Sequence, residues 1–244
     1  MYERLKEILK QIIPEKRVSQ IEFPLRKIYS VFYFGKNVHC PVCENSFSKF
    51  ILLPDGDLKC PRCGSLARQR RLCLLLMNEI KPDKEDVVLH LSPSRSIQRR
   101  LKNNSGFNYV TSDYEKGRGA DKNYDLTSID EEDEMYTVII CYHILEHIQD
   151  DQKAMKELFR ILKPNGILLV QTPFRPGNIY EDLSIKTRSE RFKHFGQEDH
   201  VRIYSVDGLK HRLEEAAFRV QVKYFDEDVY FGLQGNEVVL FCSK

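Results

Sequence analysis

The 244-residue chain lacks any apolar run long enough to cross a bilayer. Runs such as 72–77 fall far short of the roughly 20 residues that a membrane-spanning helix needs. The first ten residues include five charged side chains and do not resemble a secretory signal peptide. We find no internal repeat and no low-complexity tract. These absences argue against a membrane-spanning or secreted protein and predict a cytoplasmic location.

Glycine is missing where nucleotide-binding folds need it. We expect a strand at 87–91, a turn at 92–94 and a helix that Ser94 can cap and that runs to about residue 102. The first turn of a dinucleotide-binding fold has the pattern G-x-G-x-x-G, but residues 89–94 read LHLSPS. A P-loop is missing as well. A pyrophosphate could hardly approach this backbone, which argues against NAD and ATP as ligands.

The composition is that of a soluble globular protein, with 41% hydrophobic and 30% charged residues. The net charge of +2 conceals an asymmetry. Residues 1–84 have 16 Lys and Arg against 9 Asp and Glu, whereas residues 85–244 have 22 against 27. A basic front half suggests an anionic partner such as RNA, and a solvated surface with incidental charge is the alternative. Four metal-bound thiolates would also offset about two of these positive charges.

Four of the seven cysteines form two Cys-x-x-Cys pairs, Cys40 with Cys43 and Cys60 with Cys63, separated by 16 residues. Each pair forms a tight turn that directs two thiolates to one point, so two turns complete a tetrahedral sulfur site. Gly64 follows the second pair, where a positive φ would help backbone N–H groups to reach sulfur. Two disulfides or four unlinked thiols are the alternatives, although the cytosol disfavours disulfides. The pattern predicts a structural metal site, for which zinc is preferred and iron is also suited.

The residues around the cysteines predict a small zinc ribbon between helical segments. A helix at 65–80 begins with Arg68, Arg70 and Arg71, which either bind a phosphate or carboxylate or lie on a solvated face. The predicted domain boundaries are 1–38 for an N-terminal helical segment, 39–66 for the ribbon, 67–85 for a connecting helix and linker, and 86–244 for the main domain. The other predicted elements are a helix at 1–13, a second near 24–34 with an apolar patch, a strand at 47–53 and a turn at 54–56.

From residue 86 the chain alternates apolar runs with helical patterns. The clearest unit spans 136–166, where an uncharged run at 137–141 precedes a helix that Asp150 or Asp151 can cap and Pro164 ends. It reads as a parallel βαβ unit, and the alternation predicts an α/β fold with a doubly wound, mostly parallel sheet. The remaining predicted elements are strands at 109–111, 120–126, 219–225 and 238–242, a helix at 206–217, and a polar lid insertion at about 175–204.

Two aspartates end successive strands of this predicted sheet. Asp113 follows the second strand, where a carboxylate can accept both hydroxyls of a ribose. Asp125 ends the third strand and could accept a hydrogen bond from an adenine amino group. Aspartates often simply cap turns, but two at successive strand ends favour an adenosine ligand. Because the phosphate-binding glycines are missing, S-adenosylmethionine fits best, since it needs only a carboxylate site at the first turn.

Residues 86–172 resemble class I S-adenosylmethionine-dependent methyltransferases of the type 11 group. The resemblance is densest at 138–147 (VIICYHILEH) and 160–166 (RILKPNG). A branch of that group has a Cys-x-x-Cys ribbon in front and a stretch similar to 195–204, which extends the resemblance to about 40–220. It implies a Rossmann-like sheet of seven strands, the last antiparallel. The glycine-free first turn departs from the family, so its backbone N–H groups, with Arg95, would have to bind the methionine carboxylate.

The resemblance predicts contacts at the strand ends, and the long polar segment at 175–204 predicts contacts in the lid. The cofactor is predicted to contact His90, Ser92, Pro93, Ser94, Asp113, Asp125, Leu126, Cys141 and Tyr142. His143 after the fourth strand and His200 in the lid are the candidate catalytic groups, needed as bases only for a hydroxyl or protonated amine acceptor. His147 is predicted to pack against a helix. The predicted substrate contacts in the lid are Tyr180, Glu181, Asp182, Arg191, His194, Asp199 and Arg202, for which a solvated loop with internal ion pairs is the alternative.

The sequence therefore predicts an enzyme that moves a methyl group from a sulfonium to an oxygen or nitrogen acceptor, with a structural zinc site. The acceptor stays open among small molecules, glycans and RNA. A non-catalytic RNA-binding or scaffold protein on a degenerate methyltransferase fold is the alternative. The glycine-free turn and the basic front half motivate that alternative.

Overall fold

The computed structural model describes residues 15–104, 106–117 and 119–244, so the helix predicted at 1–13 lies outside the described residues. The described chain divides into two compact units. The first contains the residues up to Lys81, Ser94–Asn103 and Asp226–Glu237. The second contains Pro82–Pro93, Asn104–Phe225 and Val238–Lys244. The boundaries predicted at residues 38, 66 and 85 stay predictions. No helix among the described residues is long and apolar enough to span a membrane.

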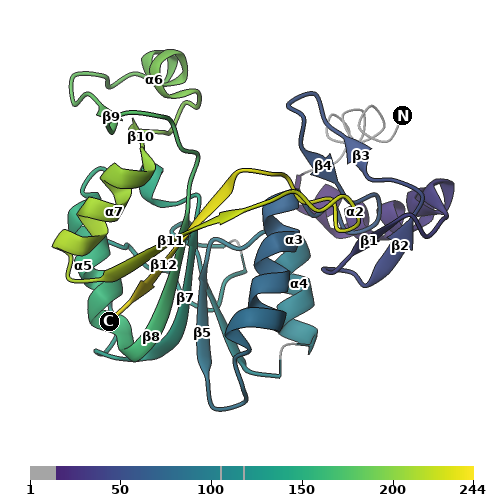
Figure 1. Ribbon diagram of the computed structural model, residues 1–244, viewed down its shortest axis with the longest axis horizontal. Helices are drawn as coiled ribbons and strands as arrows, with labels where there is room; N and C mark the ends of the chain where they lie inside the picture. Colours follow the sequence, from purple (N-terminus) through teal and green to yellow (C-terminus); the bar gives the residue numbers. More distant parts are fainter. Residues whose placement is uncertain (1–14, 105, 118) are drawn as a thin grey trace. The chain divides into compact units, whose positions relative to one another are not determined.

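A six-stranded sheet forms the centre of the second unit, in the order β11-β12-β8-β7-β5-β6 (Figure 1). The strands β6, β5, β7 and β8 are parallel, and β12 is antiparallel to β8. The predicted doubly wound sheet with an antiparallel last strand is therefore confirmed. The strands are β5 (Val87–Leu91), β6 (Asn108–Ser112), β7 (Tyr136–Tyr142), β8 (Leu162–Gln171), β11 (Arg219–Phe225) and β12 (Glu237–Ser243).

The strand predicted at 120–126 does not form in the described part of the chain, which therefore has six strands in this sheet and not seven. Lys122 makes only an isolated parallel bridge to Ser112. The carboxylate of Asp121 accepts hydrogen bonds from the N–H of Thr111 at 2.9 Å and from its hydroxyl at 2.7 Å. This side chain occupies a donor on the edge of β6 that a neighbouring strand would have used.

Apolar side chains from the sheet and two helices form the core of the second unit. Helix α5 (Asp151–Ile161) contacts β8 and α7 (Val206–Glu215), and it buries Met155 and Leu158 completely. Asp150 caps α5, as predicted, by accepting a hydrogen bond from the N–H of Lys153 at 3.1 Å. The predicted lid has structure of its own, β9 (Tyr180–Glu181), α6 (Arg188–Phe195) and β10 (Arg202–Ile203), and Figure 1 shows it at one end of the sheet. The short 3₁₀ helix η3 (Leu145–His147) follows β7.

The first unit contains two small hairpins and several helices, and two of its elements differ from prediction. The helix predicted near 24–34 begins at Glu15, includes Pro24 and continues as a 3₁₀ turn. Contacts on both sides of the proline favour the longer helix, because Phe23 lies under the Arg99 guanidinium and Glu22 pairs with Arg26. The apolar patch predicted there, including Phe32 and Phe34, is exposed. The elements are α2 (Glu15–Tyr29), η1 (Ser30–Tyr33), β1 (Val38–Cys40), β2 (Asn45–Phe47), β3 (Ile51–Leu52), β4 (Leu58–Lys59), α3 (Ala67–Leu74), the π-helix η2 (Leu75–Ile80) and α4 (Arg95–Asn104).

Phe50 explains why the strand predicted at 47–53 is broken. Its ring is buried and lies 4.2 Å below the guanidinium of Arg70, so the chain turns inward between β2 and β3. Arg70 also donates to the carbonyls of Ser65, Leu58 and two residues of the 226–237 segment. Arg71 bonds the Glu237 carboxylate and two more carbonyls of the same unit. Neither arginine is available to an anionic partner, so both the anion-binding and the solvated-face hypotheses are wrong for this pair.

Candidate functional site

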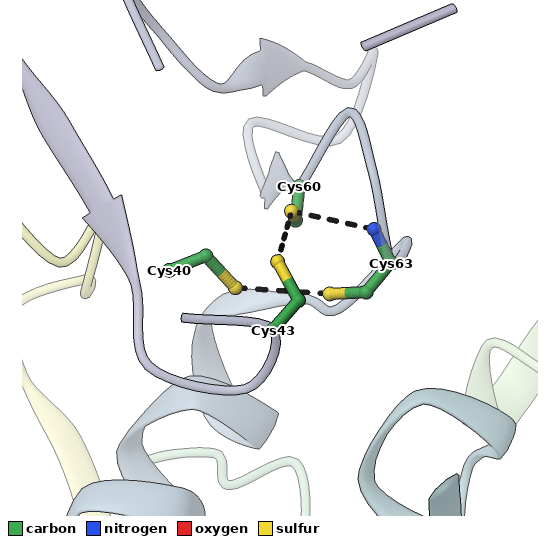
Figure 2. Close-up of side chains that lie close together, drawn as sticks. All are labelled: Cys40, Cys43, Cys60 and Cys63. Atoms are coloured by element: carbon green, nitrogen blue, oxygen red, sulfur yellow. Dashed lines mark hydrogen bonds between the residues drawn. The ribbon is translucent and has the colours of Figure 1, made fainter. Parts of the chain in front are cut away.

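The four cysteines of the two Cys-x-x-Cys turns converge on one point in the first unit (Figure 2). The sulfur of Cys40 lies 3.7 Å from that of Cys63, and the sulfur of Cys43 lies 3.8 Å from that of Cys60. A disulfide would need about 2.05 Å, so the predicted disulfide alternative is not formed. Tetrahedral zinc–sulfur bonds of about 2.3 Å place sulfurs about 3.8 Å apart. The cluster therefore fits a tetrahedral ion such as zinc.

Backbone geometry and charge support the same assignment. Gly64 has a φ of +77°, as predicted, and the Cys63 N–H lies 3.5 Å from the Cys60 sulfur. Glu44 occupies the equivalent left-handed position after the first pair, with a φ of +52°. Burial, followed by hydrogen bonding to Cys40 and Cys63, raises the pKa of the Cys60 thiol above its ordinary value. A divalent cation is what would allow all four sulfurs to be ionised together.

A cleft of about 730 Å³ opens in the second unit where β5, β6 and β7 end. Their last residues or the residues just after them, Leu91, Ser112 and His143, lie in its wall. Ligands of open α/β sheets bind at this edge, outside the carboxyl ends of the strands. Seven of the predicted site residues line the cleft: Ser92, Asp113, Asp125, Leu126, His143, Arg191 and Asp199.

Two residues in this wall hold left-handed backbone conformations that L-amino acids rarely adopt. Ser92 has a φ of +43° and its N–H bonds the carbonyl of Ser112 at 2.7 Å. His143 has a φ of +55° and its N–H bonds the carbonyl of Gln171 at 2.8 Å. Such conformations cost of order 1–3 kcal/mol each and cluster at functional sites. The turn at Ser92 thus adopts a left-handed conformation of the kind for which nucleotide-binding folds use glycine.

The two strand-end aspartates lie in the cleft wall, and each also supports its own loop. Asp113 accepts the N–H of Glu115 at 3.1 Å. Asp125 accepts the N–H of Thr127 at 2.9 Å and its hydroxyl at 2.7 Å. These hydrogen bonds from Thr127, the backbone one first, lower the pKa of Asp125, so this carboxylate is ionised at neutral pH. The turn-capping role weighed from the sequence is real, and it coexists with a position in the cleft.

Other predicted cofactor residues lie outside the cleft wall. His90 is buried, its Nδ1 lies 2.9 Å from the Tyr109 hydroxyl, and burial lowers its pKa to about 3. Cys141 is buried, and burial raises its pKa. Pro93 and Tyr142 are half-buried beside the wall residues. Ser94 belongs to the first unit, where it lines a cavity of about 350 Å³ together with Arg95. Contacts of these residues with a cofactor stay predictions.

The segment after β7 contains a residue that the sequence analysis did not single out, Glu146. Its side chain is 1% exposed, and its Oε1 lies 3.4 Å from Nδ1 of His143. Burial acts to raise the pKa of Glu146, but the adjacent His143 and His147 lower it to a value below the ordinary one. His147, predicted to pack against a helix, instead lines the cleft. The His-x-x-Glu-His spacing was the available signal, because the 3₁₀ turn at Leu145–His147 holds Glu146 and His147 directly after His143.

The lid contributes two groups to the cleft and uses others to hold itself in place. Arg191 and Asp199 line the cleft. Arg202 is buried and bonds Glu181 at 2.9 Å and the carbonyls of Leu145, Ile148 and Gln149. Tyr180 and His194 bond each other at 2.7 Å. His200 is buried, and burial lowers its pKa, followed by the effect of His147.

Parts of this chain are similar in sequence to known proteins, and its fold is similar to that of solved structures. The ubiquinone biosynthesis O-methyltransferase of Rickettsia conorii is 33% identical over 69 residues, which is 28% of this chain and 24% of that protein. The match thus spans about a quarter of the relative's length. A SAM-dependent methyltransferase from Archaeoglobus fulgidus shares the fold, with a TM-score of 0.51 and 16% identity over 73% of this chain and 92% of that one.

A further solved structure is the 1,6-didemethyltoxoflavin-N1-methyltransferase of Burkholderia thailandensis with S-adenosylhomocysteine bound. It has a TM-score of 0.51 and 15% identity, and the match covers 73% of this chain and 78% of that one. At this identity both structures speak for the fold alone. Residues 75–222, more than half of the chain and including the whole cleft wall, match the family described as a methyltransferase domain, and the chain therefore belongs to that methyltransferase family.

Proposed function

We propose that this protein transfers a methyl group from S-adenosylmethionine to an acceptor held in the cleft at the carboxyl edge of the sheet. The observation that carries the proposal is the pair of strand-end carboxylates, Asp113 and Asp125, beside the left-handed turn at Ser92 in one cleft. The cleft volume of about 730 Å³ lies within the range of small-molecule and cofactor sites.

The residues of the cleft fit the parts of the cofactor. Asp113 would accept hydrogen bonds from the ribose hydroxyls, and Asp125 would accept one from the adenine amino group, with Leu126 as apolar contact. The N–H groups of the turn after β5 are the candidates for its carboxylate. When bound, the cofactor supplies an electrophilic methyl group on its sulfonium. The protein's own contribution is to orient the acceptor and exclude water.

The acceptor atom in this proposal is oxygen or nitrogen. The segment shared with ubiquinone biosynthesis O-methyltransferases supports oxygen. A hydroxyl acceptor needs a base, and His143 is the imidazole at the end of β7 that lines the cleft. His200 lies outside the cleft wall, so we assign the proton-accepting role to His143 first.

We also propose that the four cysteines bind zinc as a structural ion, on the basis of the sulfur separations of 3.7 and 3.8 Å. Four protein ligands close the site, so no coordination position is left for chemistry. The ion would support hairpins that have only two or three residues per strand.

Calorimetry with S-adenosylmethionine and S-adenosylhomocysteine tests the cofactor assignment. We expect Asp113→Asn to raise the dissociation constant about tenfold to a hundredfold, since hydrogen bonds to charged groups contribute roughly 1.5–3 kcal/mol. Asp130→Asn, an exposed aspartate outside the cleft wall, is the matched control and should bind as the wild type does. Absence of binding heat with both compounds in the wild type would sink the proposal.

A further inference from the structure

A second group of metal-ligating side chains lies in the second unit. Glu146 and His147 belong to η3, after β7, and His200 lies just before β10. One ligand atom from each of the three lies within 4.8 Å of the others. A backbone hydrogen bond of 2.9 Å, from Val201 N–H to the Glu146 carbonyl, joins the two segments beside these side chains.

The Glu146 carboxylate is the strongest sign that this group takes a ligand. It is 1% exposed, and within the described chain neither of its oxygens has a hydrogen-bond partner. The nearest ionisable group, Nδ1 of His143, is 3.4 Å away from Oε1. A buried carboxylate is costly unless hydrogen bonds or a cation compensate for the lost water. A bound cation would give both buried oxygens the partner that they lack in the described chain.

Both histidines are oriented as metal ligands are. Nδ1 of His200 lies 3.3 Å from the carbonyl oxygen of Phe195, which can only accept, so this nitrogen carries the proton. Nδ1 of His147 lies 3.3 Å from Oδ2 of Asp199, with the same consequence. Histidines that bind metals typically donate their other ring N–H to a carboxylate or a backbone carbonyl. In both residues Nε2 is thus left as the nitrogen with an available lone pair.

Arg202 keeps the ligand segment in place. Its guanidinium donates to the carbonyls of Leu145, Ile148 and Gln149, on both sides of Glu146 and His147. The side chain is 3% exposed, so the segment is held from within the fold. A preorganised backbone lets the ligands converge without a large rearrangement.

We propose that Glu146, His147 and His200 bind one divalent transition-metal ion beside the cleft, through the carboxylate and the two Nε2 atoms. Two imidazoles and one carboxylate suit zinc, iron(II), cobalt or nickel rather than magnesium or calcium. Bonds of about 2.1 Å require ligand atoms about 3.4 Å apart, so the three groups, now within 4.8 Å of one another, would close by up to about 1.4 Å. Three protein ligands would leave coordination positions open, and an oxygen of an acceptor in the cleft that His147 lines could occupy one of them. This use of the ion rests on the proposed methyl transfer, whereas ion binding does not.

Cobalt(II) is the probe, added to full-length protein whose cysteine site is already filled with zinc. Calorimetry should show one cobalt ion bound per chain. Glu146→Gln and His200→Ala should each weaken binding at least tenfold, and His211→Ala, an exposed histidine on α7, should leave it unchanged. Asp199→Asn should not impair folding, because that side chain is 71% exposed. It should weaken cobalt binding about tenfold or more.

The outcomes separate this site from the others. No cobalt uptake by the wild type, or equal affinity in all four variants, overturns the proposal. A thiolate-to-cobalt absorption band in the near ultraviolet also overturns it, because the ion would then be at the cysteines. Cobalt binding by a protein that fails to bind S-adenosylhomocysteine would support the ion site and refute only the proposed methyl transfer.

Discussion

The cysteine cluster and the cleft are two sites built in opposite ways. The four cysteines lie within 24 positions of the chain, Cys40 to Cys63, and their sulfurs already have tetrahedral separations. The cleft is assembled from the ends of β5, β6 and β7 and from the lid. In and beside it, the Glu146 carboxylate and Nε2 of His143 are buried without hydrogen bonds in the described chain. A structural metal site takes all its ligands from the protein, whereas a ligand-binding site has polar groups without protein partners.

The two units nevertheless share one means of support, a buried arginine that donates to backbone carbonyls. Arg70 bonds four carbonyls in the first unit, and Arg202 bonds three in the second. In each case one buried guanidinium donates hydrogen bonds to several backbone carbonyls in short elements and the loops beside them. The two units therefore secure these loops in the same way.

Removal of a metal ligand should have the largest effect and should be confined to the first unit. We expect Cys60→Ser to lower the free energy of unfolding of that unit by more than about 4 kcal/mol, since loss of a structural metal is among the most destabilising changes. Hydrogen exchange should increase in peptides from 38–80 and stay slow in β7 and β8. Cys73→Ala removes a thiol outside the cluster and is the control. Equal loss of protection in both units would show that they are not separately stabilised.

Replacement of the two buried arginines, Arg70 and Arg202, should have the second largest effect on stability. Arg70→Met and Arg202→Met should each cost about 3 kcal/mol in urea unfolding, because each leaves several buried carbonyls unpaired. Hydrogen exchange should locate the first effect at residues 58–65 and 226–237 and the second at 145–149. Arg188→Met, at an exposed arginine on α6, should change stability by less than about 0.5 kcal/mol. A loss below about 1 kcal/mol for either buried arginine would contradict the shared support.

Acid should weaken the second unit through His90. Burial lowers the pKa of this imidazole from 6.5 to about 3, so protonation is more favourable in the unfolded chain. The contribution is complete above pH 6.5 and is lost as the pH falls toward 3, at up to about 1.4 kcal/mol per pH unit. His90→Asn keeps an acceptor for Tyr109 and should flatten the pH profile of the urea midpoint between pH 6.5 and 4. A profile parallel to that of His211→Asn would argue against this role.

The smallest effect is expected at the glycine-free turn. Ser92→Gly should relieve the left-handed strain at φ +43° and raise stability by less than about 1 kcal/mol, because glycine also gains freedom in the unfolded chain. Urea unfolding measures this gain. The dissociation constant for S-adenosylhomocysteine should stay within about twofold of the wild type, since the proposed contacts there come from the backbone. A large loss of affinity would show that the serine hydroxyl itself binds the ligand.

The sequence by itself determined the features that depend on neighbours in the chain. Two Cys-x-x-Cys turns bring their sulfurs together because a tight turn sets the geometry of each pair, and Gly64 was predictable for the same reason. The strands β5 and β7 and the cap at Asp150 followed from apolar runs and from a carboxylate beside free N–H groups. The alternation of these elements was enough to predict the sheet and the edge where its cleft opens.

Tertiary structure alone decided the hydrogen-bond and ion-pair partners of the long polar side chains. Arg70 and Arg71 were indistinguishable from surface arginines until the segment 226–237 supplied their carbonyl partners. The strand predicted at 120–126 was replaced by the Asp121 carboxylate on β6. Glu146 and His147 became a candidate ion site only when the fold placed His200 beside them. Local spacing sets backbone geometry, but burial and pairing of charges depend on segments that are distant in the chain.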